Sequence, residues 1–238
     1  GENLEGAGPD GLPPGIMTAH EAEKARSFPV ALEGARYAAS RCFLRAVLSE
    51  HTGRPAGELE FSRSSGGKPA LVDAPSGLYF NLSHSGDSAL LALAESDVGV
   101  DIERHRRLKD LDSLVEYAFA PEEIELFRDL PGGAREGIFF RAWCLKEAVI
   151  KAWGERAAIF LDRIRVIAAG PEAFQPGDGP DGQGTVPTVR FADAYEREGE
   201  VYRSRFLDLL PGYSSAVCMR APEIDEVRIH RYRWPSGV

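Results

Sequence analysis

Long hydrophobic runs, a cysteine pattern and a basic charge balance are all missing from this sequence of 238 residues. No apolar run approaches the ~20 residues that a membrane span needs, and the first residues lack the basic-then-apolar order of a signal peptide. We therefore expect a cytoplasmic protein without a membrane partner. The three cysteines, Cys42, Cys144 and Cys218, have no C-x-x-C spacing, which argues against a zinc site or a disulfide framework. We expect three reduced, buried thiols.

The charge balance is acidic, with a formal net charge of -9 at pH 7. Such a charge repels a polyanion unless a local basic patch overrides it, so we do not expect nucleic acid as a partner. Hydrophobic residues make up 43% and charged residues 27% of the chain, as in ordinary globular proteins. The length fits one large domain or two half-size lobes.

Helix signals begin after a lead-in that is rich in glycine and proline. Residues 1–17 show no periodicity, so we expect them to be flexible. Thr18 and Glu21 have the spacing of a capping box, which predicts that a helix begins there. Apolar residues at helical spacing predict a second helix over residues 32–50, ended by Gly53.

From residue 78 to residue 103 the hydrophobic pattern changes to period two, with turn signals at 85–87 and 95–97. This pattern predicts three short antiparallel strands in a meander. Two further helices are predicted next, one with Pro121 in its first turn and one over residues 134–153, ended by Gly154.

Strand patterns then return at residues 163–168, 185–192, 200–209 and 213–219. Between the first two, the Gly/Pro-rich residues 170–187 are expected to be mobile. The repeated order of helix then strands predicts an α+β protein with two similar lobes, residues 18–105 and 106–238. Each lobe would pack a small antiparallel sheet against a long helix.

The stretch "VGVDIE", residues 98–103, places two carboxylates one residue apart on a strand. Because side chains alternate along a strand, Asp101 and Glu103 share a face with Gly99. Their like charges repel at that spacing, a cost that a bound divalent cation removes. Acidic residues are also common on a solvated strand face, so the spacing alone leaves both interpretations open.

A second stretch, "WCLKEAVIKAWG" at residues 143–154, lies near the end of a predicted helix. Trp143, Glu147 and Lys151 are four residues apart and lie along one stripe. Glu147 and Lys151 could be an ordinary surface ion pair, worth only ~0.3–0.5 kcal/mol. They could equally line a site, because Trp143 should be at least partly buried.

Two loops carry groups that suit a phosphate. Ser83 and His84 in "NLSHSG" lie at a turn, where hydroxyl, imidazole and backbone N–H groups suit an anion. A Ser-His nucleophile pair is less favoured, since neighbours on a strand point apart and no third member is evident. Lys68 in "GGKP" follows a glycine turn, a pattern that is also ordinary in surface loops.

Taken in order, "GKP", "SHSG", "GVDIE" and "WCLKEAVIK" resemble the 4′-phosphopantetheinyl transferases. The similarity is to their longer, two-lobed type, which activates carrier domains of nonribosomal peptide and polyketide synthases, and it covers residues 18–220. The resemblance implies a pseudo-two-fold fold with the active site in the cleft between the lobes. A site built in this way needs no second copy, so we expect a monomer.

The resemblance also implies the chemistry. A serine of an apo acyl or peptidyl carrier protein would attack the β-phosphate of coenzyme A, and 3′,5′-ADP would leave. Asp101, Glu103 and Glu147 match the ligands of Mg²⁺ in the family, and hard carboxylate oxygens suit that ion. Lys151 would neutralise or protonate the leaving group.

Further positions match family residues that bind coenzyme A or act as the base. Those that would hold the 3′-phosphate and its neighbours are Ser83, His84, Lys68, Arg36 and, more loosely, Lys24. Lys146 is another candidate for coenzyme A, although it lies about 100° around the helix from Glu147. Glu123 matches a proposed catalytic base, but it would also be a favourable acid in a first helical turn.

Docking of an acidic carrier calls for a local basic patch, for which "RHRRLKD" at residues 104–110 is the candidate. A solvated loop is the alternative. Two other functions stay open for the whole chain: a metal-dependent phosphohydrolase that uses the same three acids, and a non-catalytic module that binds coenzyme A or a carrier.

Overall fold

The computed structural model describes residues 15–154, 161–167, 188–191, 202–220 and 230, which fall into two compact units. The first unit comprises the described parts of residues 1–62, 71–75 and 226–238, and the second comprises those of 63–70 and 76–225. These bounds differ from the predicted lobes, since the predicted boundary at residue 105 lies inside the second unit. A pseudo-two-fold relation between lobes stays a prediction. Most of the lead-in and the 170–187 insertion lie outside the described residues.

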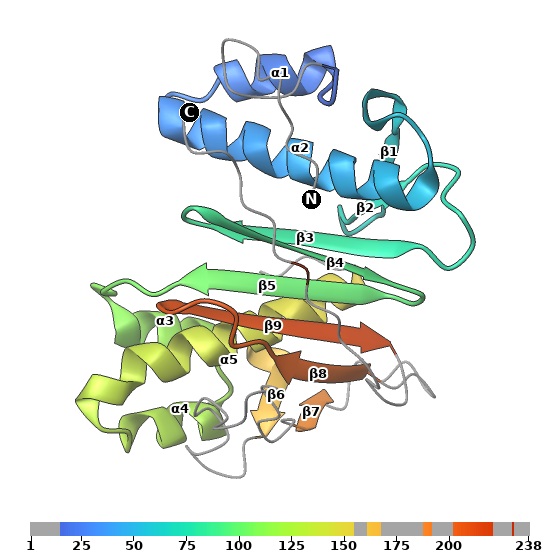
Figure 1. The fold of residues 1–238 in the computed structure, drawn as a ribbon. Helices are drawn as coiled ribbons and strands as arrows, with labels where there is room; N and C mark the ends of the chain where they lie inside the picture. The colour runs from blue at the N-terminus through green and yellow to red at the C-terminus, as the bar shows by residue number, and fades with distance from the viewer. Residues whose placement is uncertain (1–14, 155–160, 168–187, 192–201, 221–229, 231–238) are drawn as a thin grey trace. The chain divides into compact units, whose positions relative to one another are not determined.

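The first unit is built on two helices and one short 3₁₀ turn: α1 (Ala19–Arg26), α2 (Ala31–Thr52) and η1 (Ala56–Glu58) (Figure 1). The capping box predicted at Thr18 is present, with Thr18 and Glu21 bonding each other's backbone N–H groups. Gly53 ends α2 in the left-handed conformation, with φ of 69°, as predicted from sequence. The two helices pack closely at Gly34, which has no side chain. A Cβ at this position would lie only 2.3 Å from the Ala25 carbonyl oxygen.

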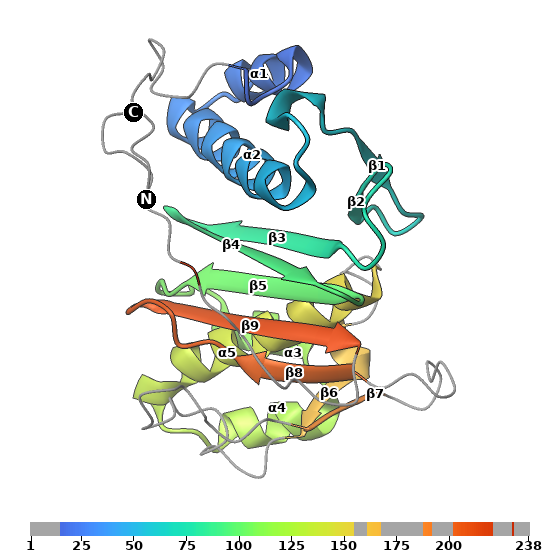
Figure 2. The same cartoon turned by 45° about the vertical axis from the view of Figure 1, so that its right-hand side comes forward.

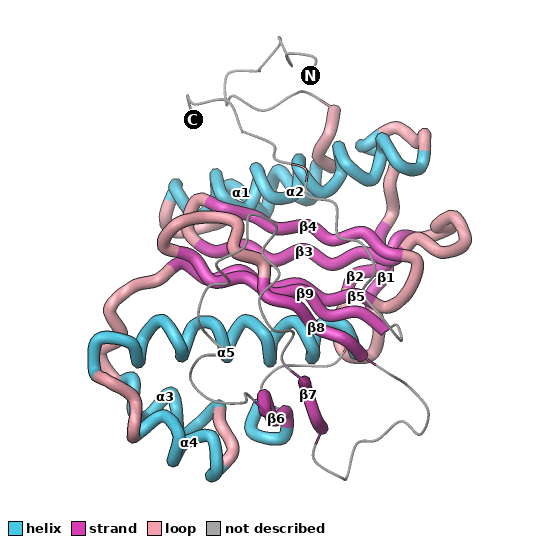
Figure 3. Tube along the Cα trace, turned by 60° about the horizontal axis from the view of Figure 1, so that its bottom comes forward, coloured by secondary structure: helices cyan, strands magenta, loops and turns pink. Residues whose placement is uncertain are grey.

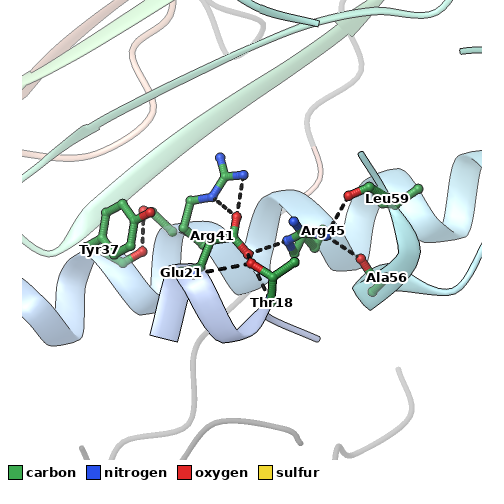
Figure 4. A network of polar contacts seen from close by, with 8 residues as sticks. Thr18, Glu21, Tyr37, Arg41, Arg45, Ala56 and Leu59 are labelled. Atoms are coloured by element: carbon green, nitrogen blue, oxygen red, sulfur yellow. Dashed lines mark hydrogen bonds and ion pairs between the residues drawn. The ribbon is translucent and has the colours of Figure 1, made fainter. Parts of the chain in front are cut away.

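A charged network fastens α1 to α2 (Figure 4). Glu21 is buried and accepts hydrogen bonds at 2.7 Å from Nε of Arg41 and from Nε of Arg45. The second guanidinium also donates to the carbonyl oxygens of Ala56 and Leu59. Every charged group in this network therefore has a partner of opposite charge or a hydrogen bond.

The strands of the structure form four small sheets in the described part of the chain: β1–β2, β3–β4, β5–β9–β8 and β6–β7. Their bounds are β1 (Phe61–Arg63), β2 (Pro69–Leu71), β3 (Tyr79–Ser85), β4 (Ser88–Ala94), β5 (Val98–Arg104), β6 (Ile164–Ile167), β7 (Thr188–Phe191), β8 (Tyr202–Phe206) and β9 (Tyr213–Arg220). The pairings β3–β4, β5–β9, β8–β9 and β6–β7 are antiparallel. With the helices, they confirm the α+β fold class.

The predicted three-strand meander is wrong in one respect. β3 and β4 form the expected hairpin, but β5 pairs with β9, with Asp101 opposite Ala216. The first five residues of β5 are all buried, so both faces of this part of the strand are covered. The turn at 95–97 suggested pairing with β4, whereas the actual partner lies more than a hundred residues away, which local patterns do not reveal.

The long helix α5 (Gly132–Trp153) lies along one face of the β5–β9–β8 sheet (Figures 1 and 3). It ends at Gly154, with φ of 75°, as predicted. Most of its last four turns are buried in one apolar cluster with residues of β8 and β9. Two shorter helices, α3 (Leu111–Ala118) and α4 (Pro121–Arg128), contribute to the same cluster and lie near α5 in two views (Figures 1 and 2).

Three further predictions concern the short helices, the cysteines and membrane-spanning segments. Pro121 begins α4 as expected, but α3 was not predicted. No proline or glycine marks the start of α3, and its N-cap Asp110 makes no side-chain capping bond. The three cysteines are free and buried, as expected. Among the described residues there is no helix with the length and hydropathy required to span a membrane.

Candidate active site

The second unit brings the two acidic motifs together by packing α5 directly on β5. Gly99, Asp101 and Glu103 share one face of the strand, and Gly99 has no side chain to hold the helix away. A Cβ on Gly99 would lie 2.1 Å from the Ala148 carbonyl oxygen and 2.2 Å from the Ala152 nitrogen. The glycine of "GVDIE" therefore sets how closely the strand carboxylates approach the helix.

Lys151 of α5 contacts the strand acid and the helix acid. Its ammonium Nζ lies 2.6 Å from Asp101 Oδ1 and 3.9 Å from Glu147 Oε2. It also donates to Ser83 Oγ at 3.2 Å. Asp101 is buried, whereas the Lys151 side chain is 28% exposed. The cluster thus has one buried wall and one edge that is open to solvent.

One carboxylate oxygen of Asp101 has no hydrogen-bond partner in the described part of the chain. Its Oδ1 accepts hydrogen bonds from Lys151 and from Ser83, but no described residue donates to Oδ2, which is buried. The Cys144 thiol lies beside this carboxylate, and its pKa is raised first by burial and then by Asp101. Cys144 Sγ donates to the Ser214 carbonyl oxygen at 3.3 Å, and a hydrogen-bond interaction with Asp101 also contributes to the raised pKa of the thiol. A buried carboxylate oxygen without a donor is a costly arrangement that a cation would relieve.

The pKa values of Glu103 and Glu147 are raised, first by burial and then by neighbouring negative charge. Burial raises the pKa of Glu147 to about 7, with Asp101 and Glu103 adding to the rise and Lys151 opposing it. The pKa of Glu103 is also raised, mainly by burial, against the hydrogen bond from Ser85. Perturbed carboxylates of this kind are typical of functional sites.

Two serines of β3 hold the strand acids. Ser83 Oγ donates to Asp101 Oδ1 and Ser85 Oγ donates to Glu103 Oε2, both at 2.8 Å. Sequence reasoning assigned Ser83 to coenzyme A and gave Ser85 no role. Their spacing of two residues placed both on one face of a strand, but it could not show that this face meets β5.

The donor chemistry at this cluster suits a divalent cation, although the ligands are not preassembled. No three His, Cys, Asp or Glu side chains in the described ranges converge as a metal site. The Lys151 ammonium, however, already places a positive charge between Asp101 and Glu147, and Asp101 Oδ2 is buried without a donor from the described residues. Carboxylate oxygens are the ligands that Mg²⁺ prefers, so the residues present fit the ion. That Asp101, Glu103 and Glu147 bind it together stays a prediction.

Of the predicted coenzyme A ligands, Lys68 and His84 also lie in the second unit. Lys68 Nζ donates to the carbonyl oxygens of Val98 and Ala152, at 2.9 and 3.2 Å, so it ties the start of β5 to the last turn of α5. These two bonds use two of its three ammonium protons, and no described residue accepts the third. His84 is exposed, and no hydrogen bond to its ring is found among the described residues, which leaves the imidazole available to a ligand.

Lys146 and Glu123 form a buried ion pair. Lys146 is 0% exposed, and its Nζ donates to Glu123 Oε2 at 2.6 Å and to the carbonyl oxygens of Ala118 and Leu161 at 3.0 Å. These three bonds use all three ammonium protons, so the contacts of Lys146 do not support a role in binding coenzyme A. Glu123 also caps α4 by accepting the Ala120 N–H at 2.9 Å. For Glu123 these contacts favour the structural alternative over the catalytic base, and the latter stays a prediction.

Lys24 and Arg36 belong to the first unit. The Lys24 ammonium lies 5.1 Å from the centre of the Tyr37 ring, and Arg36 lies 2.6 Å from the exposed Glu33. Their part in a coenzyme A site stays a prediction.

The basic stretch after Glu103 is exposed. Arg104, Arg106, Arg107 and Lys109 are all accessible to solvent. Arg106, whose side chain is 62% exposed, lies 3.7 Å from Glu103 and over the Phe140 ring. The patch therefore begins directly beside the acidic cluster.

Comparisons with known proteins place similarity over most of the chain. A model of the 4′-phosphopantetheinyl transferase superfamily matches residues 97–192, and one of the N-terminal part of 4′-phosphopantetheinyl transferases matches residues 15–96. The 4′-phosphopantetheinyl transferase HetI of Nostoc sp. is 41% identical over 145 residues, 60% of this chain and 61% of the relative.

The 4′-phosphopantetheinyl transferase psf-1 of Bacillus pumilus is 30% identical over 203 residues, 85% of this chain and 78% of the relative. The ffp protein of Bacillus subtilis, also named a 4′-phosphopantetheinyl transferase, is 26% identical over 216 residues, 89% of this chain and 85% of the relative.

Proposed function

Because the chain belongs to the 4′-phosphopantetheinyl transferase superfamily, we propose that it transfers the phosphopantetheine arm of coenzyme A to a serine of an apo acyl or peptidyl carrier protein. The observation that carries the proposal is the cluster in which Lys151 contacts the buried carboxylates of Asp101 and Glu147 at a solvent-open edge, with the partly exposed Glu103 on the same strand face as Asp101. The protein would act as a cytoplasmic monomer, without nucleic acid or membrane.

In the proposed reaction the serine Oγ attacks the β-phosphorus of coenzyme A. The bond from that phosphorus to the bridging oxygen breaks, the electron pair leaves with 3′,5′-ADP, and the serine proton passes to a base. Negative charge develops on the bridging oxygen and on the phosphoryl oxygens as this bond breaks. Preorganised positive groups that stabilise this charge are therefore the main way in which a protein can lower the barrier of the reaction.

Asp101, Glu103 and Glu147 are the residues that would hold Mg²⁺, which when bound supplies positive charge to the pyrophosphate. Lys151 would stabilise or protonate the bridging oxygen. Its ammonium is within reach of two carboxylates and partly exposed, so it is anchored by the site and accessible to a substrate.

Recognition of coenzyme A would rest on the basic and polar groups that remain available. His84 on β3 is exposed and has no hydrogen bond to its ring from the described residues, and Lys68 donates to two carbonyl oxygens within that part of the chain. For Lys24 and Arg36 of the first unit, a role in binding coenzyme A stays a separate prediction from the resemblance. The 3′-phosphate is the group that distinguishes coenzyme A from its dephospho form, so we expect His84 and Lys68 to bind it. Ser83 would contribute less through its hydroxyl, because that group is bonded to Asp101.

Release of 3′,5′-ADP distinguishes the proposed transferase from its rivals. The protein would be incubated with coenzyme A and Mg²⁺, alone or with an apo carrier domain, and 3′,5′-ADP would be quantified by chromatography. We expect release only with the carrier, in amounts equal to the carrier modified. Release without a carrier would favour a phosphohydrolase, and no release with several carriers would favour a binding module.

The exposed basic stretch is the proposed docking surface for the carrier. Reversing charge at Arg106 and Arg107 (R106E/R107E) should raise the KM for the carrier about tenfold, with little change in coenzyme A binding. Steady-state kinetics at varied carrier concentration would measure this, with Arg203→Glu, an exposed arginine of β8, as the control. An unchanged KM in the double variant would remove the patch from the proposal.

A further inference from the structure

Polar side chains join β3 to β5 where the described strands have no backbone ladder between them. β3 pairs with β4 and β5 pairs with β9, yet three alternate residues of β3 bond to β5 in matching order. The Val100 N–H donates to Asn81 Oδ1 at 2.8 Å, Ser83 bonds to Asp101, and Ser85 bonds to Glu103. Alternation along the strand turns all three to one side.

The hydroxyl of Ser83 has a fixed direction. Lys151 Nζ donates to its oxygen at 3.2 Å, and an ammonium group can only donate. The single hydroxyl proton is therefore free to point at Asp101 Oδ1, 2.8 Å away. Asp101 Oδ1 thus receives both Ser83 and Lys151, and Oδ2 receives no described donor.

Ser85 repeats this arrangement at the next acid. The Arg104 N–H donates to Ser85 Oγ at 3.1 Å, and the hydroxyl proton goes to Glu103 Oε2 at 2.8 Å. The nearest charge, Arg106, lies 3.7 Å from the same oxygen. No hydrogen bond from the described residues reaches Oε1. Each serine therefore accepts from an N–H group on one side and donates to one carboxylate oxygen on the other.

We propose that Ser83 and Ser85 are positioning residues that fix the carboxylates of Asp101 and Glu103 and leave one oxygen of each available to a divalent cation. This inference rests on the proposed function, since it assigns the partners that orient two of the proposed metal ligands. Such outer partners restrict the rotation of a ligand, so that less freedom is lost when the ion binds.

Asn81 serves to distinguish the orienting of a carboxylate from the simple stabilisation of the contact between β3 and β5. It makes the same kind of bridge between the strands, but to the backbone of Val100 and to neither carboxylate. Loss of Asn81 should lower stability alone, whereas loss of either serine should also lower the affinity for the ion.

The test is Mn²⁺ binding in the absence of turnover, measured by electron paramagnetic resonance with the full chain. Ser85→Ala should weaken binding about tenfold, and Ser85→Thr, which keeps the hydroxyl, should restore it. Ser88→Ala is the matched control, because Ser88 lies opposite Ser85 in the hairpin and bonds to neither acid. In the transfer assay, Ser85→Ala should raise the Mg²⁺ concentration for half-maximal rate by the same factor, with kcat largely recovered at saturation.

Wild-type affinity for Mn²⁺ in Ser85→Ala would overturn the inference while leaving the proposed function intact. If Ser85→Ala does not fold, Mn²⁺ affinity would be measured in Ser85→Cys, which has a similar volume but is a weaker hydrogen-bond donor. Wild-type affinity in Ser85→Cys would equally overturn the inference. If the wild-type protein itself binds no Mn²⁺, the metal site of the proposed function fails, and this inference with it.

Discussion

Glu21 in the first unit and Asp101 in the second are both buried carboxylates that contact a basic side chain. The two differ in how many positive groups surround them relative to negative ones. Two arginines and a capping box surround Glu21 (Figure 4), whereas a single lysine contacts two of the three acids of the Asp101 cluster. Glu21 therefore has a partner for each oxygen, while Asp101 has a buried oxygen without a described donor.

The titration of the two regions shows the same contrast. Burial acts to raise the pKa of Glu21, but hydrogen bonds from Arg45, the Thr18 N–H and Arg41 outweigh it, and the pKa is lowered. In the second unit burial prevails, and the pKa of Glu147 rises to about 7. A balanced buried charge holds elements together, whereas an excess of buried negative charge costs stability and persists where a ligand compensates it.

Neutralising an acid of the second unit should abolish transfer without unfolding the protein. Asp101→Asn and Glu147→Gln each remove a proposed metal ligand and also some charge repulsion, so we expect transfer to fall about 10³-fold with thermal stability unchanged or higher. Carrier modification rates and thermal unfolding measure the two effects. Asp97→Asn, a half-buried acid just before β5 that contacts Arg220, is the control, and near-normal rates in Asp101→Asn would refute the metal assignment.

Filling the space at Gly99 should disturb the same site through packing alone. A methyl group there would meet the backbone of α5 at 2.1 and 2.2 Å, so Gly99→Ala should displace the helix that carries Glu147 and Lys151. We expect transfer to fall about 10²-fold and the free energy of unfolding to fall by about 2 kcal/mol.

The control for Gly99→Ala is Gly137→Ala in α5, where no atom lies within 4 Å of the added Cβ. It should be neutral or slightly stabilising, because alanine favours a helix over glycine. Wild-type activity in Gly99→Ala would show that the close approach of α5 to β5 does not set the geometry of the site.

Neutralising Glu21 of the first unit should lower stability and leave transfer unchanged, the reverse of the effect expected for Asp101 and Glu147. Glu21→Gln removes the charge that Arg41 and Arg45 share, so we expect the free energy of unfolding to fall by about 2 kcal/mol. Urea unfolding at pH 7 would measure it, and transfer per folded molecule should stay the same. Glu33→Gln, in an exposed pair with Arg36, should cost less than about 1 kcal/mol. Equal losses in the two variants would contradict a special role for the Glu21 network.

The smallest expected effect is the pH dependence of the difference in unfolding free energy between wild type and Glu21→Gln. The folded state lowers the pKa of Glu21 below its ordinary value of 4.5, so its contribution is present above that value and is lost as the pH falls through the lowered pKa. The gap in unfolding free energy between wild type and Glu21→Gln should therefore narrow between pH 7 and pH 4. A gap that widens on acidification would reverse the assigned sign.

Local signals were sufficient for the helix ends but not for strand partners. The capping box at Thr18 and the stops at Gly53 and Gly154 act within a few residues, so the sequence displays them. The pairing of β5 with β9 is a long-range choice, and period two on either strand is compatible with many partners. Helix α3 has no proline or glycine at its start, and it was not predicted although Asp110, a residue type that often caps helices, precedes it.

The candidate site shows the same limit at the level of side chains. Residue type and spacing marked Asp101, Glu103, Glu147 and Lys151 as candidates, and the resemblance to the 4′-phosphopantetheinyl transferases supplied their predicted roles. They could not show that Lys146 is turned inward to Glu123, or that the hydroxyl of Ser83 is directed to Asp101. Those contacts depend on how α5 and β3 pack around β5, which no local pattern contains.

The most direct test of the account is the intact mass of an apo peptidyl carrier domain after incubation with coenzyme A, Mg²⁺ and the protein. With wild type and with Glu21→Gln, we predict a gain of ~340 Da, the mass of the phosphopantetheine arm. Asp101→Asn and an EDTA control should give none. A gain that persists in Asp101→Asn or in EDTA, or no gain with wild type on any of several carrier domains, would contradict the account.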